Sequence, residues 1–157
     1  MEDIAPGTLI AGRYRVERLL GTGSVKRVYL ARDVLTRRDV AVGVLRVSPE
    51  GDPTLGPRFS REARAASALG SPFVVRVLDV GKLGDGTRYM VTEAVLGRSL
   101  DAAIRRGAAP PEAAARWVAQ VLAALAEAHR KGVLHRDVKP ENVLLDPVPG
   151  DPVGEVA

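Results

Sequence analysis

His135-Arg136-Asp137-Val138-Lys139-Pro140-Glu141-Asn142 is the most informative stretch of this 157-residue chain. Within it, Asp137, Lys139 and Asn142 bring together a carboxylate, an ammonium group and a carboxamide. Phosphoryl transfer to a hydroxyl needs a carboxylate that accepts the hydroxyl proton, a cation near the transferred phosphate and an oxygen ligand for Mg²⁺. The octapeptide therefore indicates phosphoryl-transfer chemistry.

A second motif lies upstream, where Gly21-Thr22-Gly23-Ser24-Val25-Lys26-Arg27-Val28 joins two strand-like runs, 14–20 and 25–31. Glycines allow a turn to bring its backbone close to the phosphates of a nucleotide. Such a motif is weak when it stands alone, but its place between two strands is the one that phosphate binding requires.

Together the motifs resemble those of the eukaryotic-like (Hanks-type) serine/threonine protein kinases of bacteria, and the resemblance extends from about Gly12 to Leu145. It implies an α+β, protein-kinase-like fold. We expect a leader over residues 1–11 and a five-stranded antiparallel N-lobe with one helix over 12–94. The hinge, the first helices and the catalytic loop of an incomplete helical C-lobe would follow over 95–157.

The resemblance also implies a use of ATP and Mg²⁺ and a role for individual residues. Asp137 would accept the hydroxyl proton, Lys139 would lie at the phosphate and Asn142 would bind the metal, while His135 and Arg136 would orient the loop. The nucleotide-binding positions would be Gly21, Gly23, Val28, Ala41, Leu144 and, after the gatekeeper Thr92, Glu93 and Val95 in the hinge.

Glu62 matches the glutamate that orients the phosphate-binding lysine in this family. It lies in an alanine-rich segment, 59–69, that we expect to be helical. It could equally be a charge on the surface of that helix. Its separation of 19 residues from position 43 and of 75 residues from Asp137 favours the functional interpretation.

One departure from the family pattern is in Val40-Ala41-Val42-Gly43, because the family has lysine where this chain has Gly43. Alone, this departure indicates a pseudokinase. However, Lys26 replaces the third glycine of the glycine-rich motif, and residues two apart on a strand share a face. Lys26 should therefore lie on the nucleotide face with Val28, beside the space that Gly43 leaves.

This pairing resembles the "with no lysine" kinases, in which the second strand carries the catalytic lysine. The chain has four lysines among its 23 basic residues, so arginine is its usual basic residue. A lysine is therefore less expected than an arginine to occur at position 26 by chance. The alternative is a solvated Lys26 with no role at the phosphates.

A second departure is that no Asp-Phe-Gly follows Asn142 within the 157 residues. In the family, the aspartate of that motif holds magnesium. The last residues, 145–157, are similar to a lengthened hairpin between two short strands. We therefore expect no autophosphorylation from this polypeptide alone.

Hydrophobic periodicity and turn residues predict further strands over 40–47, 74–80 and 88–94 and helices over 99–106 and 111–130. The long helix carries an apolar stripe that includes Val118, Val121, Leu122 and Leu125. Without further C-lobe helices to cover it, this face predicts self-association.

Composition limits the partners and the location. The hydrophobic content of 46% and charged content of 27% are those of a globular domain, and the net charge of +4 is spread without a basic block, which argues against nucleic-acid binding. The absence of cysteine excludes disulfides and thiolate sites. No signal peptide or membrane-spanning run is visible, so we expect a cytoplasmic protein.

Three interpretations remain open. The first is a serine/threonine protein kinase with a relocated lysine and a protein substrate. The second is a pseudokinase module that binds nucleotide or a partner kinase, and the third is an incomplete gene product without a function. The retention of Asp137, Lys139 and Asn142 favours the first, because a scaffold has no physical need for them.

Overall fold

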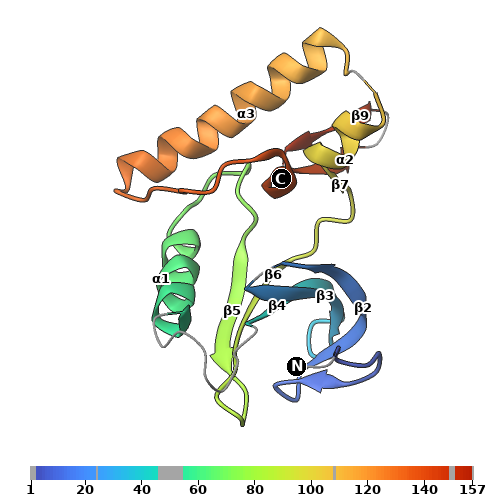
Figure 1. The fold of residues 1–157 in the computed structure, drawn as a ribbon, viewed down its shortest axis with the longest axis vertical. Helices are drawn as coiled ribbons and strands as arrows, with labels where there is room; N and C mark the ends of the chain where they lie inside the picture. Colours follow the sequence, from blue (N-terminus) through green and yellow to red (C-terminus); the bar gives the residue numbers. More distant parts are fainter. Residues whose placement is uncertain (1–2, 24, 46–54, 108, 149–150, 157) are drawn as a thin grey trace. The chain divides into compact units, whose positions relative to one another are not determined.

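The computed structural model describes residues 3–23, 25–45, 55–107, 109–148 and 151–156. The chain divides into two compact units (Figure 1). The first comprises residues 1–68 and 76–94, and the second comprises residues 69–75 and 95–157.

The first unit is built on an antiparallel sheet whose described strands run in the order β1-β2-β3-β4-β6-β5. The strands are β1 (Leu9–Ile10), β2 (Tyr14–Thr22), β3 (Lys26–Asp33), β4 (Asp39–Leu45), β5 (Val77–Lys82) and β6 (Arg88–Glu93). The five predicted strands are confirmed. The short β1 is an additional strand and lies in the range expected to be a leader, while residues 46–47 of the third predicted strand lie outside the described residues.

The core of the first unit lies on one face of this sheet. Along β4, Val40, Val42 and Val44 are at most 2% exposed, and they pack with the buried rings of Tyr14 and Tyr29. Because side chains alternate along a strand, the residues between these valines belong to the opposite face. The sheet therefore has one face filled by its own core and a second face that carries Ala41 and Gly43.

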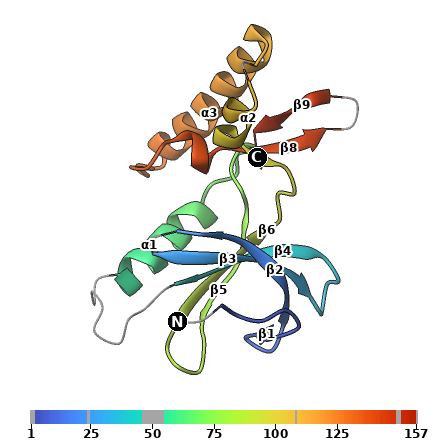
Figure 2. The same cartoon turned by 45° about the vertical axis from the view of Figure 1, so that its right-hand side comes forward.

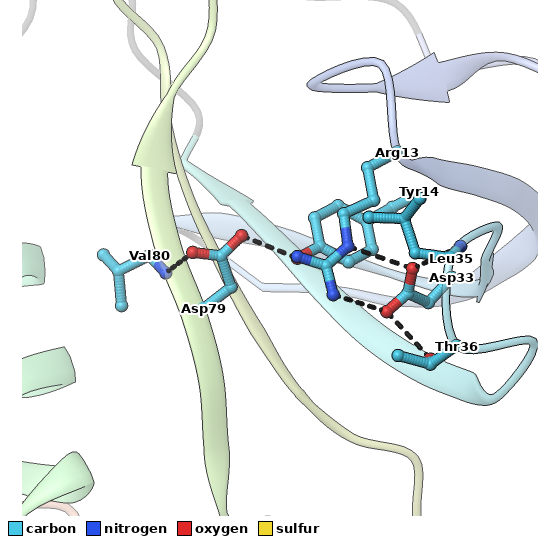
Figure 3. Close-up of polar contacts among 7 residues, drawn as sticks. All are labelled: Arg13, Tyr14, Asp33, Leu35, Thr36, Asp79 and Val80. Carbon is cyan, nitrogen blue, oxygen red and sulfur yellow. Dashed lines mark hydrogen bonds and ion pairs between the residues drawn. The ribbon is translucent and has the colours of Figure 1, made fainter.

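A polar network anchors the start of β2 to the end of β3 (Figure 3). The Arg13 guanidinium donates Nε to Oδ1 of Asp33 at 3.0 Å and Nη2 to Oδ2 at 2.7 Å. The Leu35 N–H and the Thr36 hydroxyl also donate to this carboxylate. Asp33 is 3% exposed, and its hydrogen bonds, that from Arg13 above all, hold its pKa well below the usual range. Its charge is therefore buried but fully paired.

A second part of the same network reaches β5. The Tyr14 hydroxyl donates to Oδ2 of Asp79 at 2.6 Å, and the Val80 N–H donates to the other oxygen (Figure 3). Burial, followed by the hydrogen bond to Asp79, raises the pKa of Tyr14. The contact joins β2 to a strand at the far edge of the sheet order, so it helps to hold the curled sheet closed.

Helix α1 (Leu55–Ser67) lies beside β5 in both ribbon views (Figures 1 and 2). Its buried apolar side chains, among those described, are Phe59 and Ala63, one turn apart. The helix was predicted to begin at Phe59 and begins about one turn earlier, with Pro57 in its first turn. Proline is tolerated there because the first N–H groups of a helix have no intrahelical partner.

The second unit contains α2 (Leu100–Arg105), α3 (Pro111–Arg130) and the 3₁₀ turn η1 (Pro140–Asn142). The Ser99 hydroxyl accepts a hydrogen bond from the Ala102 N–H, so Ser99 caps α2 as predicted. Helix α3 begins at Pro111 and is followed by Gly132 at φ 73°, a conformation that glycine adopts without strain. Both predicted helices are confirmed.

A small sheet completes the second unit, with β7 (Arg98–Ser99), β8 (Leu144–Val148) and β9 (Asp151–Val156) in that order. Figure 2 shows β8 and β9 side by side. The predicted hairpin at the end of the chain is formed by β8 and β9. Its inner residues Leu145 and Val156 pack against Trp117 of α3. The buried Gln120 carboxamide accepts a hydrogen bond from the Val156 N–H at 2.9 Å and so fixes β9 on α3.

Within the described ranges, no helix has the length and apolar character that crossing a membrane requires.

Candidate functional site

The first group of candidate residues lies on the sheet of the first unit. In the β3–β4 ladder, Val28 lies opposite Gly43 and Lys26 lies opposite Leu45. In the β4–β6 ladder, Thr92 lies opposite Ala41. Directly opposed residues of an antiparallel pair project to the same face. Val28, Ala41, Gly43, Thr92 and Lys26 therefore share one face of the sheet.

Lys26 and Gly43 are diagonal neighbours on that face. The Cδ of Lys26 lies 3.8 Å from the position that a Cβ on residue 43 would occupy, which is an ordinary van der Waals distance. The methylene stem of the lysine thus passes over the glycine, and its ammonium end is carried by β3 rather than β4. The side chain is exposed, so the ammonium group can reach a ligand from solvent.

The glycine-rich turn leads into Lys26. The Gly23 N–H donates to the Lys26 carbonyl at 2.8 Å and closes the turn. No described atom lies within 4 Å of the position that a Cβ on Gly21 would occupy. The backbone at Gly21 is therefore open to close approach by a ligand, as phosphate binding requires. Ser24, at the tip of the motif, lies outside the described residues.

The remaining predicted residues have different surroundings. Glu62 lies in α1, but its side chain is not among those that the structure describes. The Glu93 N–H donates to the Arg76 carbonyl at 3.0 Å, so this N–H is already paired within the first unit. Val95 is half-buried in the second unit, and the half-buried Leu144 begins β8.

The second group of candidate residues is the loop 135–142 of the second unit. The Lys139 ammonium lies 3.0 Å from Oδ1 of Asp137. The Asn142 Nδ2 donates to Oδ2 and to the backbone carbonyl of Asp137, both at 2.8 Å. The Lys139 ammonium first, and then the Asn142 amide, lower the pKa of Asp137. The loop therefore presents an ionised, solvent-exposed carboxylate held between a cation and a carboxamide.

The backbone of the loop has an unusual conformation just before this carboxylate. Arg136 has φ 62°, in the left-handed region that residues other than glycine adopt at some cost. The turn allows the Asp137 N–H to donate to Nδ1 of His135 at 3.3 Å. A 3₁₀ turn then begins at Pro140 and is closed by a hydrogen bond from the Asn142 N–H to the Lys139 carbonyl. Local geometry thus brings Asp137, Lys139 and Asn142 together.

The donor set of the loop fits a partial magnesium site. Because Asn142 uses its Nδ2 toward Asp137, its carboxamide oxygen is the atom left for a cation. Magnesium prefers oxygen ligands and is commonly held by one or two protein groups together with substrate phosphates. The described part of the chain contains no group of three or more acidic, histidine or cysteine side chains that could hold a metal ion. Asn142 would therefore supply one ligand rather than a complete site.

Two contacts were not predicted from the sequence. The Arg13–Asp33 network had a local signal, because an aspartate that accepts the N–H two residues ahead is a common turn former. The hydrogen bond from Arg88 to Ser60 joins β6 to α1 across 28 residues of sequence. No periodicity or motif marks that contact.

The protein kinase domain family matches residues 14–151. The chain therefore belongs to the protein kinase domain family, and the predicted family and fold are confirmed.

The most similar relatives include bacterial serine/threonine kinases. The chain is 41% identical over 147 residues to serine/threonine-protein kinase pkn3 of Myxococcus xanthus and 39% identical over 141 residues to serine/threonine-protein kinase PrkC of Bacillus subtilis. These matches cover 93% and 89% of this chain but 27% and 22% of the relatives. The chain thus spans about a quarter of the length of these relatives.

Solved kinase domains have the same fold. A double mutant of the PknI kinase domain of Mycobacterium tuberculosis matches with a TM-score of 0.81 and 32% sequence identity. The match covers 94% of this chain and 58% of that domain.

Proposed function

We propose that this chain carries the nucleotide-binding sheet and the catalytic loop of a serine/threonine protein kinase, which transfers the γ-phosphoryl group of ATP to a protein hydroxyl. The observation that carries the proposal is the cluster of Asp137, Lys139 and Asn142. The ionised Asp137 would accept the proton of the attacking hydroxyl, and Lys139 would neutralise charge on the transferred phosphoryl group.

The phosphate-binding cation of the upper lobe would be Lys26. Its stem lies over Gly43, the position at which the family has lysine. A lysine is a point charge on a flexible stem, so it can reach the same place from a neighbouring strand. Gly21 and Gly23 would bring backbone to the phosphates, and Val28 and Ala41 would contact the adenine from the shared face. Glu62 on α1 would orient the Lys26 ammonium.

Magnesium bound with the nucleotide would neutralise charge on the β- and γ-phosphates. The carboxamide oxygen of Asn142 would be a ligand of this ion, oriented by the two hydrogen bonds from the same carboxamide to Asp137. The hinge residues Glu93 and Val95 and the side chain of Leu144 would complete the adenine site. Because ATP is a cytoplasmic cofactor, we place this domain in the cytoplasm.

The proposal is tested by replacing the relocated lysine in the intact protein. Lys26→Ala should abolish ATP-dependent phosphorylation of a general acceptor such as casein, as should Asp137→Ala. Lys82→Ala removes an exposed lysine of β5 from the same unit and is the matched control. Normal phosphorylation by Lys26→Ala would refute the relocation, and normal phosphorylation by Asp137→Ala would refute the proposed mechanism.

A pseudokinase that binds nucleotide or a partner protein is the second candidate, and Gly43 favours it. For residues 1–157 alone, which contain no Asp-Phe-Gly, we expect no autophosphorylation. Incorporation of labelled phosphate by this polypeptide, with an inactive Asp137→Ala control, would contradict that expectation. In the intact protein, ATP binding without phosphoryl transfer would favour the pseudokinase over the kinase.

A further inference from the structure

We infer that Arg88 is a positioning residue that fastens α1, and with it Glu62, to the sheet. The inference rests on the proposed function in one respect, namely that Glu62 orients a phosphate-binding lysine. The contact itself is a property of the first unit alone.

Arg88 is the first residue of β6, and its side chain lies along α1. Its Nη1 donates a hydrogen bond to the Ser60 hydroxyl. A Cβ added to Gly56 would lie 2.7 Å from Nε of Arg88 and 3.4 Å from its Cδ. Gly56 and Ser60 are one helical turn apart and share a face of α1. The guanidinium is therefore seated against two successive turns, in space that only glycine at position 56 leaves open.

Helix α1 packs on β5 and, less extensively, on β6, the strand that carries Arg88. Of its side chains whose burial is described, Phe59 and Ala63 are the buried apolar ones, and an alanine contributes little apolar area. Hydrogen bonds from a charged donor are stronger than those between neutral groups. The guanidinium contact beside Phe59 therefore adds a charge-assisted hydrogen bond to the apolar attachment of this helix.

The sequence of β4 explains why such a contact matters here. The resemblance to other kinases implies that lysine at position 43 would meet the glutamate of the helix, but Gly43 offers no side chain. Arg88 lies on β6, the strand next to β4, two residues before Met90, which lies opposite Gly43. It supplies a cation to α1 from that neighbouring strand. Because Ser60 is two residues from Glu62 on one helix, a shift at Ser60 moves Glu62 as well.

Hydrogen–deuterium exchange in the intact protein tests the attachment directly. Arg88→Ala should speed exchange of the α1 amides about tenfold, the effect of losing one hydrogen bond to a charged group, and Ser60→Ala should do the same. Lys82→Ala is the matched control, because Lys82 lies directly opposite Arg88 on β5 and is exposed. It should leave α1 unchanged.

Two exchange results would overturn the inference. One is unchanged exchange of α1 in Arg88→Ala. The other is equal acceleration in β2 and β3, which would indicate a general structural role. Compared with Arg88→Ala, Arg88→Lys should restore part of the protection of the α1 amides against exchange. Lysine keeps a hydrogen-bond donor for Ser60 but lacks the planar guanidinium group of arginine.

Nucleotide affinity tests whether Arg88 acts through Glu62. Arg88→Ala should weaken ATP binding severalfold, and it should add little to the loss caused by Glu62→Gln, because residues that act as a unit are not additive. Additive losses would overturn the role of Arg88 as a positioning residue for Glu62. Absence of ATP binding by the unsubstituted protein would instead refute the proposed function, while the exchange of α1 would still decide whether Arg88 holds the helix.

Discussion

The side chain of Lys26 lies over Gly43, with its Cδ 3.8 Å from the point that a Cβ on residue 43 would occupy. The two residues are on neighbouring strands, since Lys26 lies opposite Leu45 and Gly43 lies opposite Val28. A lysine on β3 thus covers the position on β4 at which the family has its lysine. Relative to the family pattern, position 43 lacks the lysine side chain and position 26 carries one, and the two changes lie next to each other on one face of the sheet.

This arrangement predicts that the two positions can exchange roles. In the intact protein, Lys26→Ala should lower the rate of ATP-dependent phosphorylation by about 100-fold or more, because charge stabilisation provides most of the rate in phosphoryl transfer. Adding Gly43→Lys to that variant should restore a large part of the activity, because it returns a cation to the same face from β4. Initial rates at saturating and limiting ATP measure the effect.

Substitutions at Gly43 alone provide the control. Gly43→Ala should keep nearly full activity, because its Cβ would make only an ordinary contact with Lys26. Gly43→Leu should lower activity by displacing the lysine stem. Equal activity of Gly43→Leu and the unsubstituted protein, or no recovery in the double variant, would contradict the exchange of roles.

The buried Asp33 predicts a stability effect that is independent of catalysis. Asp33→Asn removes the charge that Arg13 pairs with through two hydrogen bonds, at 3.0 and 2.7 Å. We expect a loss of about 2 kcal/mol in the free energy of unfolding, as for a hydrogen bond to a charged group. Chemical denaturation near neutral pH, followed by circular dichroism, measures the loss.

The pH dependence of this loss has a definite sign. The pKa of Asp33 is lower in the folded state than its ordinary value of 3.8, so its contribution is fully present above that value and declines as the pH falls below it. The difference in unfolding free energy between the unsubstituted chain and Asp33→Asn should therefore shrink below about pH 4. A difference that stays constant from pH 7 to pH 3 would show that the charge is not the cause.

The exposed face of α3 predicts self-association of the 157-residue polypeptide. Val118 and Leu122 are 57% and 58% exposed and lie one turn apart, whereas Trp117 on the same helix is buried. Replacing both Val118 and Leu122 by glutamine should reduce dimers and larger species in sedimentation velocity and lower the binding of the dye ANS.

The control for this face is Ile104→Gln on α2, because Ile104 is also 57% exposed. It should change neither measurement. A monodisperse, unsubstituted polypeptide that binds no ANS would contradict the prediction.

Much of the fold could be predicted because its signals are local. Pro111 and Gly132 bracket α3, and Ser99 caps α2 through a hydrogen bond to a residue three positions away. The start of α1 was predicted one turn too late, at residue 59, whereas Pro57 lies in the first turn of the helix. Proline is compatible with both a loop and a first helical turn, so the sequence did not distinguish them.

The side-chain contacts also differ in whether the sequence gives a local signal for them. The side chains of Asp137, Lys139 and Asn142 meet within six residues, so their cluster follows from a short loop and its 3₁₀ turn. The contact between Arg88 and Ser60 has no such signal, because it depends on where α1 docks on the sheet.

The sequence by itself determined the family and the set of side chains in loop 135–142, because those depend on residue types in contiguous order. It also placed Lys26 and Gly43 on faces of their strands, because side chains alternate along a strand. Only the tertiary structure decided that the two lie diagonally across β3 and β4 within contact distance, and that Arg88 of β6 donates a hydrogen bond to Ser60 of α1. Strand register and helix docking are set by packing among residues far apart in the chain, here the valines of β4 and Phe59 of α1.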